Sequence, residues 1–284
     1  MKKWGFLLLL TGCLVFVIVE RVPFFYQHEV EIQQYEQGAS ERVEQKEIRK
    51  EQLYQGNLIL VNAEYPVQQE GVRSDIVNLY EARELTKGYT LLNSGIYLST
   101  EVALAFSEMV AAAEQDGVQH FVINSGFRDF EEQGELYQTR GADYALPAGY
   151  SEHNVGVALD VGSTETTMYE ADEGIWIEEN AWKYGFILRY PKDKTEITGI
   201  EYEPWHIRYV GLPHSAVMKE KNFVLEEYLA YLKEEEKISI TVNGESYTVA
   251  YYPYSEGMTI PVPDNHEYEL SGDNSDGVIV TVFE

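Results

Sequence analysis

Three short segments, far apart in the chain, contain residue types that together could hold a metal ion and activate a water molecule. They are SGFRDFEEQ (Ser125–Gln133), SEHNVGVALD (Ser151–Asp160) and EPWH (Glu203–His206). Two histidines and one carboxylate are a common ligand set for catalytic zinc, which keeps a fourth position for water. The sequence therefore predicts a metal-dependent site that forms where these segments meet.

The candidate ligands of this Zn²⁺ ion are His153, Asp160 and His206. His153 precedes an expected strand over residues 155–161 that contains Asp160, and Gly156 between them allows the backbone to turn tightly. The three ligand-type residues lie in segments that also contain glycine or proline, which favours one metal site over three unrelated structural side chains. We expect a single bound ion.

Glu203 is the candidate general base. In a regular strand, residues three apart point to opposite faces, so Glu203 and His206 can share a metal only if the chain bends at Pro204. From that position the carboxylate could take a proton from the attacking water and later give it to a leaving amine. An ordinary ion pair is the alternative interpretation of Glu203.

Four further residues are candidates for contact with a substrate. Arg128 follows an expected strand over 120–124 and could stabilise negative charge on a carbonyl oxygen, with a structural salt bridge as the alternative. Gln133 could face the same cleft from the start of a helix, and Ser151 could bind a terminal carboxylate. Tyr190 ends a strand and could line the floor. For the last three, a core or capping role is equally open.

The composition restricts the class of protein. The 284 residues suffice for one substantial domain and a small second one, and a hydrophobic fraction of 44% allows a packed core. The net charge of −27 argues against nucleic acid as a partner, because that binding requires clustered Lys and Arg. The single cysteine, Cys13, excludes an intrachain disulfide and a cysteine-based zinc cluster.

The N-terminal region predicts a membrane anchor followed by a linker. Residues 4–19 are apolar and follow two lysines, which is typical of an uncleaved anchor that leaves the following chain outside the cell. We therefore expect an anchor over residues 1–26 and a cell-membrane location with an extracytoplasmic catalytic domain. Lipoprotein processing at Cys13 is an alternative. Residues 27–55 are polar and rich in charge, which favours a stalk that is partly helical or disordered.

The following chain is expected to form an α+β domain over residues 56–236 and a small β-rich appendage over residues 237–284. Helices are predicted over 100–115, 130–140 and 215–236, and strands over 57–62, 120–124, 155–161, 186–190 and 207–210. In the appendage, alternation and the pair Asn243 and Gly244 predict a hairpin over 238–254. Further strands are expected at 268–270 and 278–283.

Four stretches of the chain resemble the VanY-type zinc D-alanyl-D-alanine carboxypeptidases. They are SGFRDFEEQ, LPAGYSEHNVGVALDVG, ENAWKYGFILRYP and YEPWHIRYVGLPHS, and the resemblance runs from about Tyr54 to the C-terminus. It implies the α+β fold that D,D-peptidases of this kind share with Hedgehog signalling domains. Phe127, where relatives often carry Tyr, is a small departure that leaves the ligand positions unchanged.

The resemblance also implies roles and a reaction. It assigns zinc ligation to His153, Asp160 and His206, base catalysis to Glu203, and stabilisation of the transition state to Arg128. The other three candidates, Gln133, Ser151 and Tyr190, match positions that line the substrate site in relatives. The implied reaction is hydrolytic removal of the C-terminal D-Ala from peptidoglycan pentapeptide precursors that end in D-Ala-D-Ala. Because vancomycin binds that end, its removal contributes to resistance.

Three rival functions remain open at this point. An L,D-carboxypeptidase of similar architecture would act on tetrapeptides. A non-catalytic wall-binding module of the same fold would have an inert zinc site, although Glu203 and Arg128 argue against it. A serine carboxypeptidase would need a Ser-x-x-Lys motif, which the chain lacks, and a Lys-Thr-Gly motif, whereas Lys194 and Thr195 are followed by Glu196.

Overall fold

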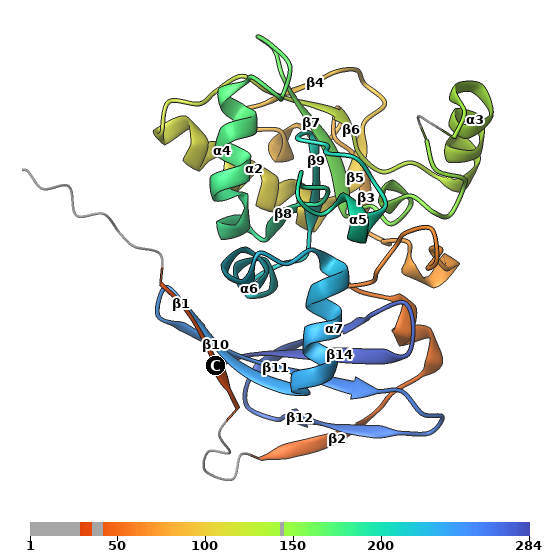
Figure 1. Cartoon of the computed structure of the whole chain (residues 1–284), viewed down its shortest axis with the longest axis vertical. Coiled ribbons are helices and arrows are strands. Elements are labelled where there is room, and N and C mark those ends of the chain that lie inside the picture. The colour runs from red at the N-terminus through yellow and green to blue at the C-terminus, as the bar shows by residue number, and fades with distance from the viewer. Residues whose placement is uncertain (1–28, 36–41, 143–144) are drawn as a thin grey trace, which may run out of the picture.

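The computed structural model describes residues 29–35, 42–142 and 145–284, which form two stacked units (Figure 1). The first unit combines a five-stranded sheet with most of the helices. The second is built on an antiparallel sheet near the C-terminal end of the chain. Helix α6 lies between the two units, and α7 runs from there over the sheet of the second unit (Figure 1). The fold is thus of the expected α+β class, with additional strands at the C-terminal end.

The sheet of the first unit has the strand order β4-β6-β7-β9-β8. Its strands are β4 (Thr90–Leu91), β6 (Phe121–Ser125), β7 (Ala158–Ser163), β8 (Phe186–Leu188) and β9 (His206–Tyr209). β4 runs parallel to β6, and the other neighbours are antiparallel. A separate antiparallel pair is formed by β3 (Ile76–Asn78) and β5 (Tyr97–Ser99). The four predicted strands of this sheet are present, with their ends shifted by up to three residues.

Helix α2 (Thr100–Gln115) packs on this sheet and coincides with the predicted range. Its buried residues recur at helical spacing and are Val102, Ala103, Phe106, Met109, Val110 and Ala113. Phe106 contacts Phe121 and Phe186 of the sheet edge to face, with ring centroids 6.4 and 6.2 Å apart. Because burial of such a ring contributes roughly 1.5–3 kcal/mol, these contacts fix the helix against the strands.

The remaining helices of the first unit are α3 (Phe130–Arg140), α4 (Asp172–Asn180) and the short α5 (Thr195–Thr198). α3 coincides with the predicted range. It begins with a capping box, in which Asp129 accepts from the backbone N–H of Glu132 and Glu132 accepts from that of Asp129. It ends at Gly141, whose φ of 84° is open to glycine. Local sequence therefore sets both ends.

The predicted helix over 215–236 is in fact two helices, α6 (His214–Lys221) and α7 (Leu225–Glu235). Asn222 ends α6 with a φ of 51°, a left-handed conformation that asparagine tolerates better than most residues. The chain changes direction there, so that α7 lies over the C-terminal sheet (Figure 1). An amphipathic pattern that runs across a short break cannot reveal this turn.

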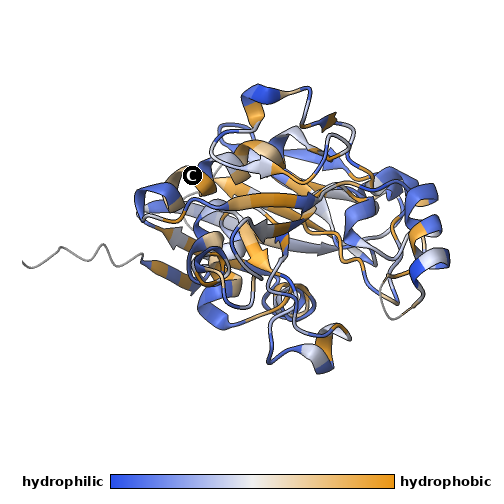
Figure 2. Cartoon of the chain, turned by 90° about the horizontal axis from the view of Figure 1, so that it is seen from above, coloured by the Kyte–Doolittle hydropathy of each residue, from blue (hydrophilic) through white to orange (hydrophobic). Residues whose placement is uncertain are grey.

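The sheet of the second unit has the order β1-β10-β11-β14-β13, and β12 pairs with β2 beside it. The strands are β1 (Val30–Gln34), β2 (Val43–Glu47), β10 (Lys237–Val242), β11 (Glu245–Pro253), β12 (Thr259–Pro263), β13 (Glu267–Gly272) and β14 (Gly277–Phe283). Asn243 and Gly244 have φ values of 52° and 89° and form the predicted hairpin. In the molecule as a whole, seen from above in Figure 2, hydrophobic residues are concentrated on strands in the middle, and hydrophilic residues predominate on the peripheral helices and loops.

The described part of the predicted stalk, residues 27–55, is not a linker. It supplies β1, β2 and the 3-10 helix η1 (Lys50–Tyr54) to the second unit. Val30 and Ile32 alternate along β1 and pack against the core of that unit, and Leu53 in η1 is buried. The polar composition concealed these strands, because a strand at the edge of a sheet buries only every second residue.

The predicted strand over 57–62 is irregular backbone without a partner strand. Its apolar side chains are nevertheless buried and enter the two cores alternately, Leu58 and Leu60 in one and Ile59 and Val61 in the other. Side chains replace a strand ladder here, because Arg208 donates hydrogen bonds to two carbonyl oxygens of this segment at 2.9 and 3.0 Å. The apolar pattern of residues 57–62 thus predicted correctly that these apolar side chains are buried, but the strand predicted from the same pattern is wrong.

The anchor predicted over residues 1–26 lies outside the described residues. Within residues 29–35, 42–142 and 145–284, none of the helices combines the length and the apolar character that crossing a membrane requires. This finding contradicts the predicted location at the cell membrane.

Candidate active site

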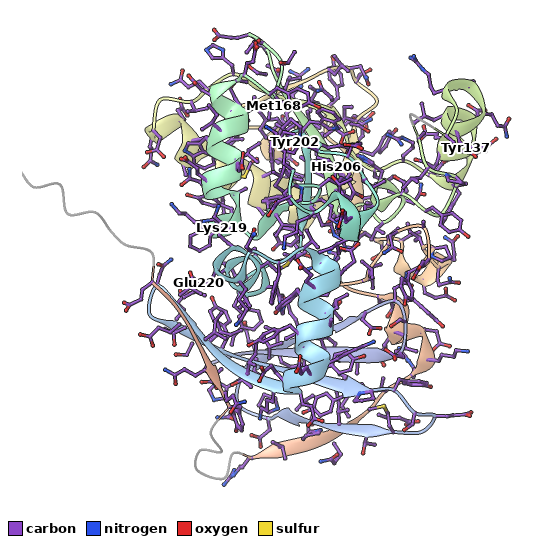
Figure 3. All side chains as sticks on the ribbon, viewed as in Figure 1. Tyr137, Met168, Tyr202, His206, Lys219 and Glu220 are labelled. Atoms are coloured by element: carbon purple, nitrogen blue, oxygen red, sulfur yellow. The ribbon has the colours of Figure 1, made fainter. Side chains whose placement is uncertain are left out.

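The structure brings the three predicted ligands together. His153 lies on the 3-10 turn η4 (Glu152–Asn154), Asp160 in the middle of β7, and His206 at the start of β9. Asp160 Oδ2 is 3.3 Å from His153 Nε2, and its Oδ1 is 3.1 Å from His206 Nδ1. One ligand atom from each residue lies within 4.8 Å of the other two. Figure 3 labels His206 within the first unit.

The outer ring nitrogens show that these donors fit a metal ion. His153 Nδ1 donates a hydrogen bond to the carbonyl oxygen of Gly126 at 2.6 Å. His206 Nε2 lies 3.3 Å from the carboxylate of Glu152, to which it donates a hydrogen bond. Since each imidazole uses one nitrogen as a donor, the other nitrogen keeps its lone pair toward the shared centre. Two nitrogens and one carboxylate oxygen suit zinc with an open fourth position.

The electrostatics of the site favour a cation. Burial acts to lower the pKa of His206, but its hydrogen bonds to Asp160 and Glu152 raise the pKa to about 9. Burial acts to raise the pKa of Asp160, but the two histidines hold this pKa below its usual range. Negative charge that favours a proton on an imidazole equally favours a divalent ion beside it. The donor set therefore agrees with the predicted Zn²⁺ site.

The turn that carries His153 depends on two neighbours. Ser151 caps η4 by accepting a hydrogen bond from the backbone N–H of His153 at 3.4 Å. Gly156 follows with a φ of 94°, and a Cβ added to it would lie 2.4 Å from Ile76 Cδ1. The glycine predicted beside the metal is thus needed both for its backbone conformation and for close packing.

Glu203 and His206 are the ends of a tight turn, as the prediction required. The backbone N–H of His206 donates to the carbonyl oxygen of Glu203 at 3.2 Å, with Pro204 between them. Glu203 Oε2 thereby comes within 4.0 Å of His206 Nδ1. Burial raises the pKa of Glu203, His206 opposes the rise, and Asp160 and Glu152 add to it. A carboxylate with a raised pKa beside a metal position suits a general base.

Arg128 is held next to the strand that carries Asp160. Its Nη1 donates to Gln133 Oε1 at 2.6 Å, and its Nη2 donates to the hydroxyl of Ser125 at 3.0 Å. Ser125 is the residue paired with Asp160 across β6 and β7. Gln133 is buried and also donates to the carbonyl oxygen of Leu146 at 2.6 Å. The predicted substrate residue Gln133 thus orients Arg128.

Tyr190 packs directly on a predicted ligand. The centroids of the Tyr190 ring and the His206 imidazole are 5.0 Å apart, and the angle between the two ring planes is 38°. The side chain is buried, and burial raises the pKa of its phenol. In the structure Tyr190 is therefore a wall against His206, and Ser151 is a cap, as their alternative interpretations allowed.

A buried charged cluster that was not predicted from the sequence lies behind His206. Glu152, Arg189 and Arg208 are fully inaccessible to solvent, and Glu152 Oε1 is 2.8 Å from a nitrogen of each arginine. Burial acts to raise the pKa of Glu152, but Arg208, Arg189 and His206 together hold it well below its usual range. The sequence held one signal of this cluster, since an arginine interrupts each of two apolar strand patterns. Arg189 lies within Phe186–Tyr190, and Arg208 lies within Ile207–Val210.

Comparison with known proteins agrees with this geometry. The model of the VanY D-alanyl-D-alanine carboxypeptidase family matches residues 95–212, which include every predicted site residue. A D-alanyl-D-alanine carboxypeptidase of Enterococcus faecium is 62% identical over 294 residues, which span 100% of this chain and 97% of the relative.

Solved structures show the same fold. The vancomycin resistance D,D-dipeptidase VanXYg, in complex with a D-Ala-D-Ala phosphinate analogue, is 32% identical with a TM-score of 0.74, over 86% of this chain and 100% of that one. The LD-carboxypeptidase LdcB is 31% identical with a TM-score of 0.52, over 60% and 84% of the two chains. Because the similarity to the Enterococcus faecium relative extends over the full length of both proteins, the chain belongs to the VanY family of D-alanyl-D-alanine carboxypeptidases.

Proposed function

We propose that this protein is a zinc-dependent D,D-carboxypeptidase that removes the C-terminal D-Ala from peptidoglycan pentapeptide precursors. The observation that carries the proposal is the arrangement of His153, Asp160 and His206 around one centre, with the carboxylate of Glu203 4.0 Å from His206 Nδ1. The full-length relative from Enterococcus faecium supports the same substrate class.

When bound by these three residues, zinc supplies a Lewis acid that makes water a usable nucleophile near neutral pH. Glu203 takes one proton from the attacking water, whose oxygen forms a bond to the carbonyl carbon of the penultimate D-Ala. The C–N bond to the terminal D-Ala then breaks, and Glu203 gives the proton to the leaving amine. The products are a tetrapeptide carboxylate and free D-alanine, so no further reactant is needed.

Arg128 is the candidate for stabilising the negative charge that develops on the carbonyl oxygen. Gln133 and Ser125 hold its guanidinium in one orientation, so little rearrangement is needed during the reaction. Ser151 accepts a backbone hydrogen bond and still has a hydroxyl proton to offer the terminal carboxylate of the substrate. Tyr190, whose ring packs on His206, would line the floor of the substrate site.

Removal of the terminal D-Ala would destroy the D-Ala-D-Ala end that vancomycin binds. The D-Ala-D-Ala dipeptide analogue bound by the related VanXYg supports recognition of that end by this fold. The protein would thereby contribute to vancomycin resistance and to cell-wall metabolism.

The test is end-point analysis of a synthetic pentapeptide ending in D-Ala-D-Ala, with and without a zinc chelator. We expect free D-alanine and tetrapeptide, loss of both products in chelator, and recovery on addition of zinc. A tetrapeptide substrate should be added in parallel, because the similarity to LdcB makes an L,D-carboxypeptidase the relevant competitor. Faster cleavage of the tetrapeptide would overturn the proposed specificity, and cleavage of neither would favour a non-catalytic module.

A further inference from the structure

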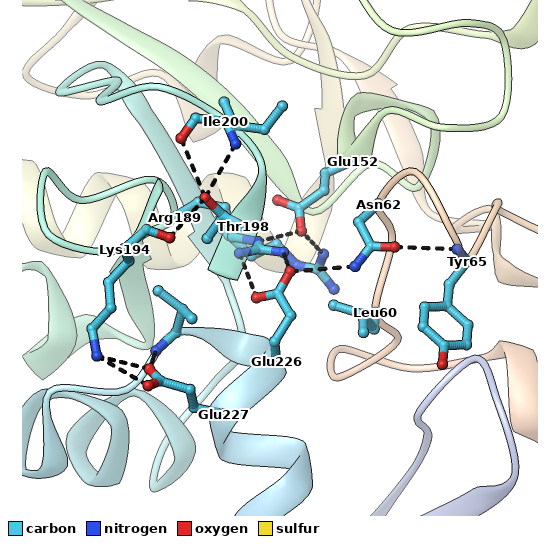
Figure 4. Close-up of polar contacts among 12 residues, drawn as sticks. Leu60, Asn62, Tyr65, Glu152, Arg189, Lys194, Thr198, Ile200, Glu226 and Glu227 are labelled. Carbon is cyan, nitrogen blue, oxygen red and sulfur yellow. Dashed lines mark hydrogen bonds and ion pairs between the residues drawn. The ribbon is translucent and has the colours of Figure 1, made fainter. Parts of the chain in front are cut away.

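Behind the metal site, four charged side chains form one continuous network, which consists of Glu152, Arg189, Arg208 and Glu226. Figure 4 labels three of them, Glu152, Arg189 and Glu226. Glu152 accepts from Arg208 and Arg189 through Oε1 and faces His206 Nε2 with Oε2. Arg189 then meets Glu226 of α7, with Nη2 to Oε1 at 2.8 Å and Nη1 to Oε2 at 3.0 Å. The chain of contacts therefore runs from His206 to α7, a helix that lies over the sheet of the second unit.

The two carboxylate oxygens of Glu152 have different hydrogen-bond partners. The two arginine contacts, both 2.8 Å long, hold Oε1 from two directions, so the carboxylate plane has little freedom. Oε2 is then presented to the imidazole of His206 at 3.3 Å. Because the Nε2–H of His206 donates a hydrogen bond to this oxygen, Nδ1 must face the metal position. The orientation of one ligand ring thus depends on Glu152.

Glu226 completes the network from outside the sheet. Its side chain is 15% exposed, whereas those of Arg189, Arg208 and Glu152 are wholly buried. Two acids and two arginines balance in formal charge, so Arg189 is neutralised on both sides. Buried ion pairs of this kind contribute little to stability compared with apolar packing, and their better-attested use is to specify one geometry.

We propose that Glu152 is a positioning residue for the metal site and that Glu226 of α7 acts on the site through it. The packing between the two units would then contribute to metal affinity, although no residue of α7 or of the C-terminal sheet is among the ligands. This inference concerns metal binding and is independent of which peptide is cleaved.

The test measures the affinity of the metal-free full chain for Co²⁺ and Zn²⁺ by competition with a coloured chelator. Glu152→Gln should weaken binding by roughly 10–100-fold, the usual cost of losing the partner of a ligating histidine. Glu226→Gln should weaken it in the same direction by a smaller factor. The Co²⁺ absorption bands should shift in both variants, which a loss of overall stability alone would not cause.

Glu227→Gln is the matched control. Glu227 is the next residue on α7 and has its own ion pair, to Lys194 at 2.9 Å, which does not lead to Glu152 (Figure 4). The Glu227→Gln variant removes the same charge from the same helix as Glu226→Gln. We expect its metal affinity and its Co²⁺ absorption bands to match those of the wild type. Equal affinities of the Glu226→Gln and Glu227→Gln variants would overturn the role of Glu226, even if Glu152→Gln failed to fold.

The double variant Glu152→Gln with Glu226→Gln decides whether the two residues act in series. If Glu226 acts through Glu152, the double variant should bind the metal about as tightly as Glu152→Gln alone. If the fold-loss in metal affinity of the double variant equals the product of the two single losses, the residues act independently and the proposed connection is rejected. Since the probe is the metal alone, a failure to release D-alanine from any peptide would leave this result unaffected.

Discussion

Asp160 and His206 are directly paired residues of the neighbouring strands β7 and β9, and their Oδ1 and Nδ1 atoms lie 3.1 Å apart. The sheet register therefore fixes two of the three metal donors relative to each other. His153 reaches the same centre from the turn η4, just before β7. A site built this way depends on strand pairing more than on any loop, and its ligands can be tested one at a time.

Loss of a ligand should remove the metal. His206→Ala leaves one imidazole and one carboxylate, which are too few donors for a tightly held zinc ion. We expect metal analysis of the purified variant to find little zinc and peptide assays to find no D-alanine release. Zinc content equal to that of the wild type would reject His206 as a ligand.

Loss of the base should leave the metal in place. Glu203→Gln keeps the shape of the side chain but cannot accept a proton, so turnover of the pentapeptide should fall by about 10²–10⁴-fold. Zinc content should match the wild type, which separates this variant from His206→Ala. An unchanged turnover number would show that Glu203 does not act as the base.

Gly156→Ala should destabilise the protein by more than positive φ alone accounts for. Gly117 is the matched control, because its φ of 89° is close to the 94° of Gly156 but an added Cβ there has no neighbour within 4 Å. Gly117→Ala should therefore cost about 1–2 kcal/mol for the backbone conformation. At Gly156 the clash with Ile76 should add about 1–3 kcal/mol.

Chemical denaturation of both glycine variants and the wild type provides the measurement. If Gly156→Ala and Gly117→Ala lower the free energy of unfolding by similar amounts, Ile76 moves aside without an energetic cost. A lower zinc affinity in Gly156→Ala alone would further indicate that this turn sets the position of His153.

His214 should make the fold less stable as the pH falls. Burial lowers its pKa to about 3, while an unfolded histidine titrates near its ordinary 6.5. Between these values the unfolded chain binds a proton that the folded chain does not, so the free energy of unfolding falls by roughly 1.4 kcal/mol per pH unit on acidification. Above pH 6.5 this contribution is complete.

Urea denaturation at several pH values between 7 and 4 tests this expectation. The imidazole bonds with Tyr228 at 2.7 Å and Thr281 at 2.9 Å, and His214→Gln retains part of this polar contact without the titrating ring. Its stability should therefore depend less steeply on pH than that of the wild type. Parallel pH curves for the two proteins would contradict the role of His214.

The sequence by itself determined the features whose causes are local. The helix at 100–115 follows from its apolar spacing, and the helix at 130–140 follows from its capping box and from the glycine that ends it. Asn243 and Gly244 fix a hairpin because both positions need positive φ. The candidate ligands, Glu203 and Arg128 could be proposed because each lies in a short motif whose chemistry is specific.

Tertiary structure alone decided the features that depend on distant partners. Residues 30–34 form a strand because the edge of β10 accepts them, and residues 57–62 do not, because side chains satisfy part of their backbone. The network behind His206 joins positions up to 74 residues apart, from Glu152 to Glu226. A buried charge is recognisable only when its counter-charge is seen beside it, because local periodicity carries no information about which distant residue will meet it.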